Sequence, residues 1–169
     1  MRFSSRFGTA IHTLLLISEY SKTQKVTSDF IALQIDISPV SVRKLLGDLK
    51  KAGIVNIAPR KEKEGTTIAR PLNKITLLDI FMVAEPNQKE DINIPSTRHA
   101  NTCYSGIYVN EIILDYADTA LKAVFDAFAK ITLSDAFDTL KKKEAECPES
   151  NPRELLSKEN IKRIIASGK

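Results

Sequence analysis

The sequence contains no tryptophan, and aromatic residues of all kinds make up only 7% of the chain. It also lacks any apolar run near the roughly 20 residues that a membrane-spanning helix needs. No small-residue cleavage site follows the apolar stretch HTLLLISEY, so we expect neither a membrane partner nor a signal peptide. Two cysteines, Cys103 and Cys147, are too few for a disulfide framework. The expected location is therefore a reducing cytoplasm.

Signatures of catalysis are missing as well. His12 falls within a predicted helix, where we expect a partly buried packing role, and His99 falls in a polar segment, where we expect solvation. The sequence has no glycine-rich phosphate loop, paired metal-ligand motif or serine elbow. Because catalysis needs converging nucleophile, base and orienting groups, we expect neither an enzyme nor a metal site.

Charge is present but unevenly placed. Residues 1–75 hold 13 Lys and Arg against 6 Asp and Glu, and residues 76–169 hold 12 against 15, which gives +7 and −3 for a net +4. A basic first half joined to a mildly acidic remainder favours contact with a polyanion. The alternative, a solvated surface with a chance asymmetry, remains open on charge alone.

One segment, ISPVSVRKLLGDLKKAGIV at residues 37–55, predicts a firmly bounded helix over 39–52. Its apolar side chains fall at the i, i+3, i+4, i+7 spacing of a buried stripe, and its polar and basic side chains take the other face. Ser38 can cap the start, Pro39 suits the first helical position and Gly53 suits the end.

The flanking elements place this helix in a recognisable order. Apolar periodicity predicts helices before and after it, and KEKEG separates two short β-prone runs that predict a hairpin. Thr76 and Asp79 resemble a capping box. The expected order is helix 6–20, helix 28–35, turn, helix 39–52, runs 54–60 and 66–71, and helix 76–84. This mainly α layout, with a small β-hairpin wing, is that of a winged helix-turn-helix.

The second half predicts a loop and further helices. We expect a DNA-binding domain over 1–85, a loop over 86–103, a long helix and a following helix over 104–146, and a C-terminal tail or helix over 147–169. The long helix, 104–130, carries an apolar stripe wider than one small domain needs to cover, so we expect a homodimer. The alternative is that one chain buries the whole stripe. The expected interface residues are Ile113, Ala120, Leu121, Val124 and Phe128.

A basic helix held by a tight turn against a preceding short helix fits the DNA major groove, and its first turn reaches the base edges. The side chains expected at the bases are Val40, Ser41, Arg43 and Lys44. Lys50 and Lys51 are better placed for phosphates, and RKEK at 60–63 would lie on the wing. The complete expected DNA-binding set is Arg2, Ser4, Ser5, Arg6, Ser38, Val40, Ser41, Arg43, Lys44, Lys50, Lys51, Arg60, Lys61 and Lys63.

The segments MRFSSRFGTAIHTLLLIS, TSDFIALQIDISPVSVRKLLGDLKKAGIV and ARPLNKITLLDIFMVAE resemble the Rrf-two family of small bacterial repressors, which includes IscR, NsrR and CymR. The resemblance runs almost continuously over residues 1–85. It implies a homodimer that binds a palindromic operator in double-stranded DNA, with a long helix that crosses its partner's. It also implies a loop before that helix which, in some members, holds an iron–sulfur cluster on three cysteines.

The sequence departs from the family pattern at two places. The wing keeps Gly65 but has Thr66 and Thr67 where the family has a second glycine and an aromatic residue, which puts the wing contacts in doubt. The loop region holds one cysteine, Cys103, whereas cluster ligation wants about four protein ligands. We therefore expect a cluster-free member with no cofactor. Cys103 is a candidate redox sensor or a packing residue, and an unidentified small effector is an alternative signal.

Two functions remain in competition. The first is a sequence-specific transcriptional regulator, most often a repressor in such a family. The second is a protein-interaction module or a degenerate homologue without DNA binding, since helix-turn-helix geometry also serves protein contacts. The retained cations Arg43, Lys44, Arg60 and Lys61 favour the first.

Overall fold

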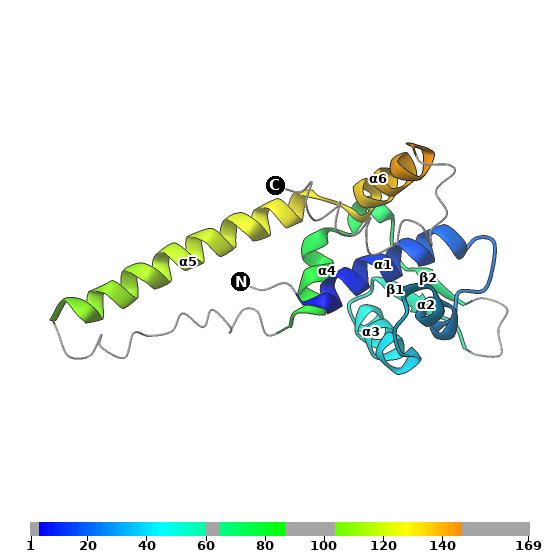
Figure 1. The fold of residues 1–169 in the computed structure, drawn as a ribbon, viewed down its shortest axis with the longest axis horizontal. Helices are drawn as coiled ribbons and strands as arrows, with labels where there is room; N and C mark the ends of the chain where they lie inside the picture. Colours follow the sequence, from blue (N-terminus) through cyan, green and yellow to red (C-terminus); the bar gives the residue numbers. More distant parts are fainter. Residues whose placement is uncertain (1–3, 60–64, 87–103, 147–169) are drawn as a thin grey trace, which may run out of the picture. The chain divides into compact units, whose positions relative to one another are not determined.

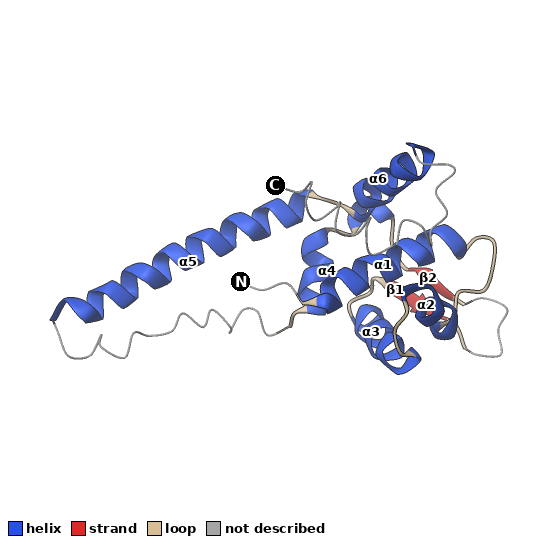
Figure 2. Ribbon diagram, in the orientation of Figure 1, coloured by secondary structure: helices blue, strands red, loops and turns tan. Residues whose placement is uncertain are grey.

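The computed structural model describes residues 4–59, 65–86 and 104–146 (Figure 1). Helices dominate these residues, with one two-stranded sheet among them (Figure 2). The chain divides into two compact units, Met1–Phe137 and Asp138–Lys169. The expected loop at 86–103 lies outside the described residues except at residue 86, and the expected tail at 147–169 lies outside them entirely.

The first two helices each begin at a side-chain cap. Helix α1 (Ser5–Tyr20) is capped by Ser4, whose hydroxyl accepts from the amide of Arg6. Helix α2 (Ser28–Ile35) is capped by Thr27 in the same way. The buried side of α1 consists of Phe7, Ala10, Thr13, Leu14 and Ile17.

His12 differs from its expected packing role. It is exposed on α1, two positions from both Ala10 and Leu14 and therefore on another side of the helix from the buried stripe. Desolvation by neighbouring atoms still lowers the pKa of its imidazole.

The turn after α2 depends on a residue in the left-handed region. Asp36 has φ 52° and ψ 51°, and the amide of Ile37 donates to the carbonyl of Ala32 at 3.1 Å. Aspartate tolerates this conformation better than most residues because its short polar side chain can bond locally. The sharp reversal places the next helix directly against α2.

Helix α3 (Pro39–Lys51) has the expected bounds within one residue. Ser38 accepts from the amide of Ser41, and Gly53 has φ 66° just beyond the C-cap. The amide of Gly53 donates to the carbonyl of Lys50, and that of Ile54 donates to Leu49. These two bonds form a Schellman motif, in which the left-handed glycine lets the helix end abruptly.

Strands β1 (Val55–Ile57) and β2 (Thr66–Ile68) form the expected hairpin. They are antiparallel, with Val55 opposite Ile68 and Ile57 opposite Thr66. A short 3-10 helix over Leu72–Lys74 then leads to helix α4 (Leu77–Ala84). The capping box at the start of α4 is present as predicted: the amide of Asp79 donates to the Thr76 hydroxyl, and the amide of Thr76 donates to the Asp79 carboxylate.

The last two described helices are α5 (Tyr104–Lys130) and α6 (Leu133–Glu146). The amide of Leu77 donates to Ile131 at 2.9 Å, and that of Leu133 donates to Ile75 at 2.8 Å. The segment between α5 and α6 is therefore hydrogen-bonded to the segment before α4. Because the hairpin follows three helices that pack on one apolar core, the protein is a winged helix-turn-helix, as expected.

Four phenylalanines join the C-terminal end of α5 to this core. The ring centroids of Phe7 and Phe128 are 5.6 Å apart, and those of Phe81 and Phe125 are 5.8 Å apart. Phe7 and Phe81 meet edge to face at 5.4 Å, a favoured geometry for aromatic pairs. Phe128, expected in a dimer interface, thus packs on its own chain.

Candidate nucleic-acid interface

The outer face of α3 presents polar and basic side chains to solvent. Val40 is 68% exposed at the start of the helix, and an apolar side chain so placed is free to contact a thymine methyl group. The expected base-contacting and phosphate-contacting residues of α3 that share this exposed face are Ser41, Arg43, Lys44, Lys50 and Lys51.

The opposite face of α3 fixes the helix in place. Val42 and Leu49 are completely buried, and Leu45 and Leu46 are each 3% exposed. Removing such side chains from water is the main force that holds the helix against the core. Helix α3 therefore has one apolar face that anchors it to the core and an opposite polar face that is open to solvent.

An ion pair ties α1 to α3. Arg6 Nη2 lies 2.6 Å from Asp48 Oδ2, and Lys51 Nζ lies 3.5 Å from Asp48 Oδ1. Burial raises the pKa of Asp48, but hydrogen bonds from Arg6 and Lys51 and their positive charges outweigh it and hold the pKa below its usual value of 3.8. Arg6, expected at DNA, is thus ion-paired with α3.

The start of α1 and the start of α3 enclose a hollow of about 340 Å³. Four of the expected DNA-binding residues line it, two from each helix: Ser5, Arg6, Ser41 and Lys44. Hydroxyl and ammonium groups are the usual donors to phosphate oxygens. The arrangement suits a stretch of DNA backbone.

Two expected DNA-binding serines are helix N-caps. Ser4 is the N-cap of α1, and its hydroxyl is hydrogen-bonded to the carboxylate of Glu85. Ser38 is the N-cap of α3, and its Oγ lies 2.8 Å from Oγ of Ser41. Both hydroxyls serve to start helices. Arg2, Arg60, Lys61, Lys63 and Cys103 lie outside the described residues.

A second hollow, of about 410 Å³, lies between α2, α3 and the base of the hairpin. Arg43 and Asp29 both line it, and Arg43 Nη1 lies 3.4 Å from Asp29 Oδ1. Asp29 was not among the expected site residues. The two residues are 14 positions apart, so no local spacing in the sequence indicates their contact.

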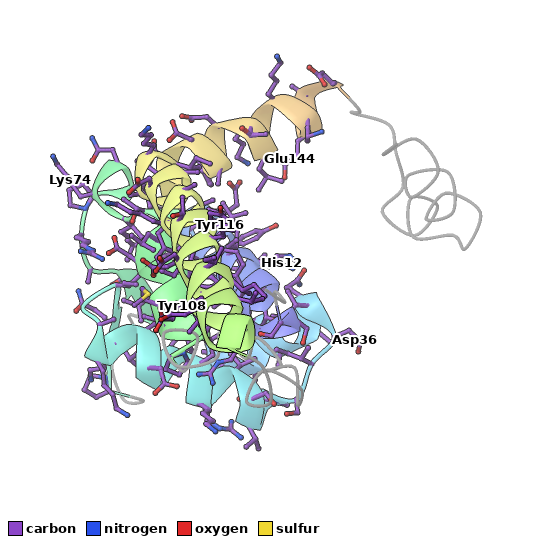
Figure 3. All side chains as sticks on the ribbon, turned by 90° about the vertical axis from the view of Figure 1, so that its left-hand side faces the viewer. His12, Asp36, Lys74, Tyr108, Tyr116 and Glu144 are labelled. Carbon is purple, nitrogen blue, oxygen red and sulfur yellow. The ribbon has the colours of Figure 1, made fainter. Side chains whose placement is uncertain are left out.

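The exposed apolar side chains of α5 lie nearer its start than expected. Of the predicted interface residues, Ala120 is exposed and the other four are half-buried. Figure 3 shows Tyr108 and Tyr116 on this helix, and Tyr116 is 72% exposed. Among the α5 side chains that the structure describes, the large exposed apolar residues are Tyr108, Val109, Ile112, Leu114 and Tyr116.

The sequence profile of the Rrf2 family, described as "Iron-dependent Transcriptional regulator", matches residues 3–139. The chain belongs to this family, the same one that its sequence motifs resemble. It is therefore a member of a family of transcriptional regulators rather than of enzymes.

Two Bacillus subtilis (strain 168) proteins, both candidate HTH-type transcriptional regulators by name, are similar to this chain. YwnA is 26% identical over 137 residues, which cover 81% of this chain and 98% of YwnA. YwgB is 33% identical over 85 residues, or 50% of this chain, and the match spans about half of YwgB, 54% of its length. The solved structure of T. potens IscR shares the fold, with a TM-score of 0.60, 20% identity and coverage of 89% of this chain and 93% of that one.

The family description raises the question of iron. An iron–sulfur cluster needs about four protein ligands, mostly thiolates, and the sequence supplies two cysteines. The donor set therefore does not fit a cysteine-ligated cluster. Within residues 4–59, 65–86 and 104–146, no three His, Cys, Asp or Glu side chains come together as metal ligands would.

None of the helices described is both long and apolar enough to cross a bilayer.

Proposed function

We propose that this protein is a sequence-specific transcriptional regulator, a repressor, that binds a palindromic operator in double-stranded DNA as a homodimer. The observation that carries the proposal is α3, a helix anchored on one face and solvated on the other, with Arg43 and Lys44 in its second turn. Such a helix suits the major groove, where each base pair presents a distinct pattern of donors and acceptors.

The proposal divides the chain by task. Residues 1–85 bind DNA, and residues 104–146 form the dimer. The loop over 86–103 connects these two parts, and residues 147–169 are a C-terminal tail or helix. The apolar side chains exposed on α5 support dimerisation, since soluble monomers rarely expose large contiguous apolar patches. A two-fold dimer would place two copies of α3 in successive major grooves roughly 34–36 Å apart. The operator is then an imperfect palindrome.

Recovery of genomic DNA bound by the full chain, followed by sequencing, is the direct test. A recurring palindrome is the expected result, and affinity for it should fall steeply as salt rises because Lys and Arg displace counterions. Recovery of no DNA beyond background would contradict the proposal and favour a protein-interaction module.

Two variants then separate base reading from phosphate contact. Arg43→Ala should lower affinity for the preferred operator by about 1–3 kcal/mol and flatten the preference among operators. Lys50→Ala, on the same exposed face, should weaken all sequences about equally. Equal preference among operators in wild type and Arg43→Ala would contradict base reading by Arg43.

The regulatory signal is proposed as either a small effector or the redox state of Cys103, the residue before α5. Operator binding by wild type and Cys103→Ser should be compared before and after mild hydrogen peroxide. For a thiol switch, wild type alone loses affinity and recovers it with reductant. An identical response of the two proteins would leave the effector as the proposal.

A further inference from the structure

The pair formed by Arg43 and Asp29 joins the two helices of the helix-turn-helix. The two atoms in contact, Arg43 Nη1 and Asp29 Oδ1, are 3.4 Å apart, and the side chains are 56% and 72% exposed. An ion pair so open to solvent adds little to stability. Its importance lies in the direction that it imposes on the guanidinium.

The geometry of the contact leaves one edge of the guanidinium free. A guanidinium carries five N–H donors in a rigid plane, and Asp29 meets the terminal nitrogen Nη1. The side edge, formed by Nε–H and the adjacent N–H of Nη2, makes no hydrogen bond to the residues that the structure describes. Two parallel donors of this kind match the O6 and N7 acceptors of guanine in the major groove.

We infer that Asp29 is a positioning residue that holds the Arg43 side chain with its free edge toward a guanine in each half-site. The inference rests on the proposed DNA binding and adds the residue that sets specificity within it. An unpartnered arginine has several rotatable bonds and can reach phosphates as readily as bases. Fixing its far end removes part of that freedom before DNA arrives, which favours base pairing over phosphate contact.

The charge of Asp29 acts in the same direction. A carboxylate beside the groove repels phosphates at every sequence, so it lowers non-specific affinity, whereas the gain from an oriented Arg43 occurs only at guanine. Both effects raise the ratio of specific to non-specific binding, which is the quantity that matters in a genome.

The opposite mechanism makes an opposite prediction. If Asp29 instead sequestered Arg43 away from DNA, its removal would free the arginine and increase discrimination for guanine. The sign of the change therefore decides between a positioning role and a competing one.

The experiment uses the full chain and the operator recovered from the genome. Dissociation constants are measured for that operator, for versions in which each half-site guanine is replaced in turn by 7-deazaguanine, which lacks the N7 acceptor, and for unrelated DNA. The proteins are wild type, Asp29→Asn, Arg43→Ala and the double variant. Asp36→Asn is the control, because it removes the same charge from the opposite end of α2, where Asp36 is the C-cap, and asparagine also tolerates the left-handed backbone.

Wild type should discriminate against one 7-deazaguanine position, and Arg43→Ala should abolish that discrimination. Asp29→Asn should lower it by about three- to tenfold, while affinity for unrelated DNA stays the same or rises, because loss of a rotamer restraint is worth a fraction of a good bidentate pair. In the Arg43→Ala background, Asp29→Asn should leave discrimination unchanged. Asp36→Asn should match wild type in discrimination.

Failure of the inference is distinguishable from failure of the proposed function. Wild type that binds no DNA contradicts the function. Wild type that binds its operator specifically, together with unchanged or increased guanine discrimination in Asp29→Asn, contradicts the positioning role alone. The positioning role is also contradicted if Arg43→Ala leaves discrimination against 7-deazaguanine intact at every position. It is contradicted likewise if Asp29→Asn changes that discrimination equally with and without Arg43.

Discussion

Gly65 lies so close to the backbone of Val26 that a β-carbon at residue 65 would come within 2.3 Å of the Val26 carbonyl oxygen. The next amide, that of Thr66, donates to the same oxygen at 2.8 Å. The hairpin is therefore attached to the segment between α1 and α2 by backbone contact. Only a residue without a β-carbon fits this close approach, which accounts for a glycine at residue 65.

Substitution of Gly65 by alanine should loosen this attachment. The added methyl group meets backbone atoms of Val26 rather than the end of a flexible side chain, so Gly65→Ala should lower the free energy of unfolding by about 1–3 kcal/mol, the range for overpacking. Gly8→Ala is the matched control: its β-carbon would meet nothing within 4 Å, and alanine in a helix should add about 0.5–1 kcal/mol. Urea unfolding measures both. Equal stability of Gly65→Ala and wild type would show that the hairpin can move away from Val26.

The pairing of Arg6 with Asp48 should appear as pH-dependent stability. The pKa of Asp48 in the folded protein is below its ordinary value of 3.8, so the unfolded state binds more protons in the interval between the two values. The stabilisation is therefore complete above about pH 4 and is lost as pH falls through the folded pKa. Asp48→Asn should lower the free energy of unfolding at pH 7 by up to about 1 kcal/mol and should lose part of the acid dependence.

Unfolding in urea between pH 3 and pH 7 tests this prediction. In an Arg6→Ala background, Asp48→Asn should have a smaller effect at pH 7, because one of the two cations that lower the pKa of Asp48 is gone and only Lys51 remains. Asp135 supplies a separate acid-sensitive contribution, since hydrogen bonds from Thr132 lower its pKa. Parallel stability curves for wild type and Asp48→Asn across the whole pH range would contradict a stabilising pair.

Much of the fold was predictable because its signals are local. The four buried residues of α3 follow helical spacing, and Ser38 and Gly53 mark its ends by chemistry that acts within a few residues. The capping box of Thr76 and Asp79 is of the same kind. Such signals depend on the neighbouring sequence alone, so the expected and observed bounds of α3 and α4 agree within one residue.

The site was less predictable because its contacts are tertiary. The contact of Asp29 with Arg43 exists only because the turn at Asp36 brings α2 against α3. The spacing of Phe128 indicates an apolar face but not what contacts that face. In the structure the half-buried Phe128 ring packs against Phe7 and Phe81, which come from elements distant in sequence.

Thr13 presents a further stability test inside the core. Its side chain is completely buried on α1, and its hydroxyl finds no hydrogen-bond partner among the residues that the structure describes. A buried hydroxyl without a partner is unfavourable by about 1–3 kcal/mol. Thr13→Val keeps the shape and removes that polar group, so it should raise the free energy of unfolding by about 1 kcal/mol. Thr119→Val, on the exposed side of α5, should change it by less than about 0.5 kcal/mol. A loss of stability in Thr13→Val would reveal a partner for the hydroxyl.

The exposed stripe near the start of α5 provides the test of assembly. Val109, Ile112, Ile113 and Tyr116 follow the i, i+3, i+4, i+7 spacing of one helix face, and Ile112 is 47% exposed. A charge there would have to be buried without a partner if a second copy packs on this face. Ile112→Asp should therefore convert a dimer to a monomer in sedimentation at micromolar concentration.

Loss of the dimer should also weaken operator binding, because the two subunits then bind the two half-sites independently. The expected loss of operator affinity in Ile112→Asp is about a hundredfold or more, the usual scale of such linkage, with little change in binding to a single half-site. Leu114→Asp is the matched control: Leu114 is as exposed as Ile112, at 49%, but lies off the stripe's spacing, so this variant should remain dimeric. A wild-type chain that sediments as a monomer would contradict both the dimer and the palindromic operator, whereas dissociation by Leu114→Asp alone would move the interface to another face of α5.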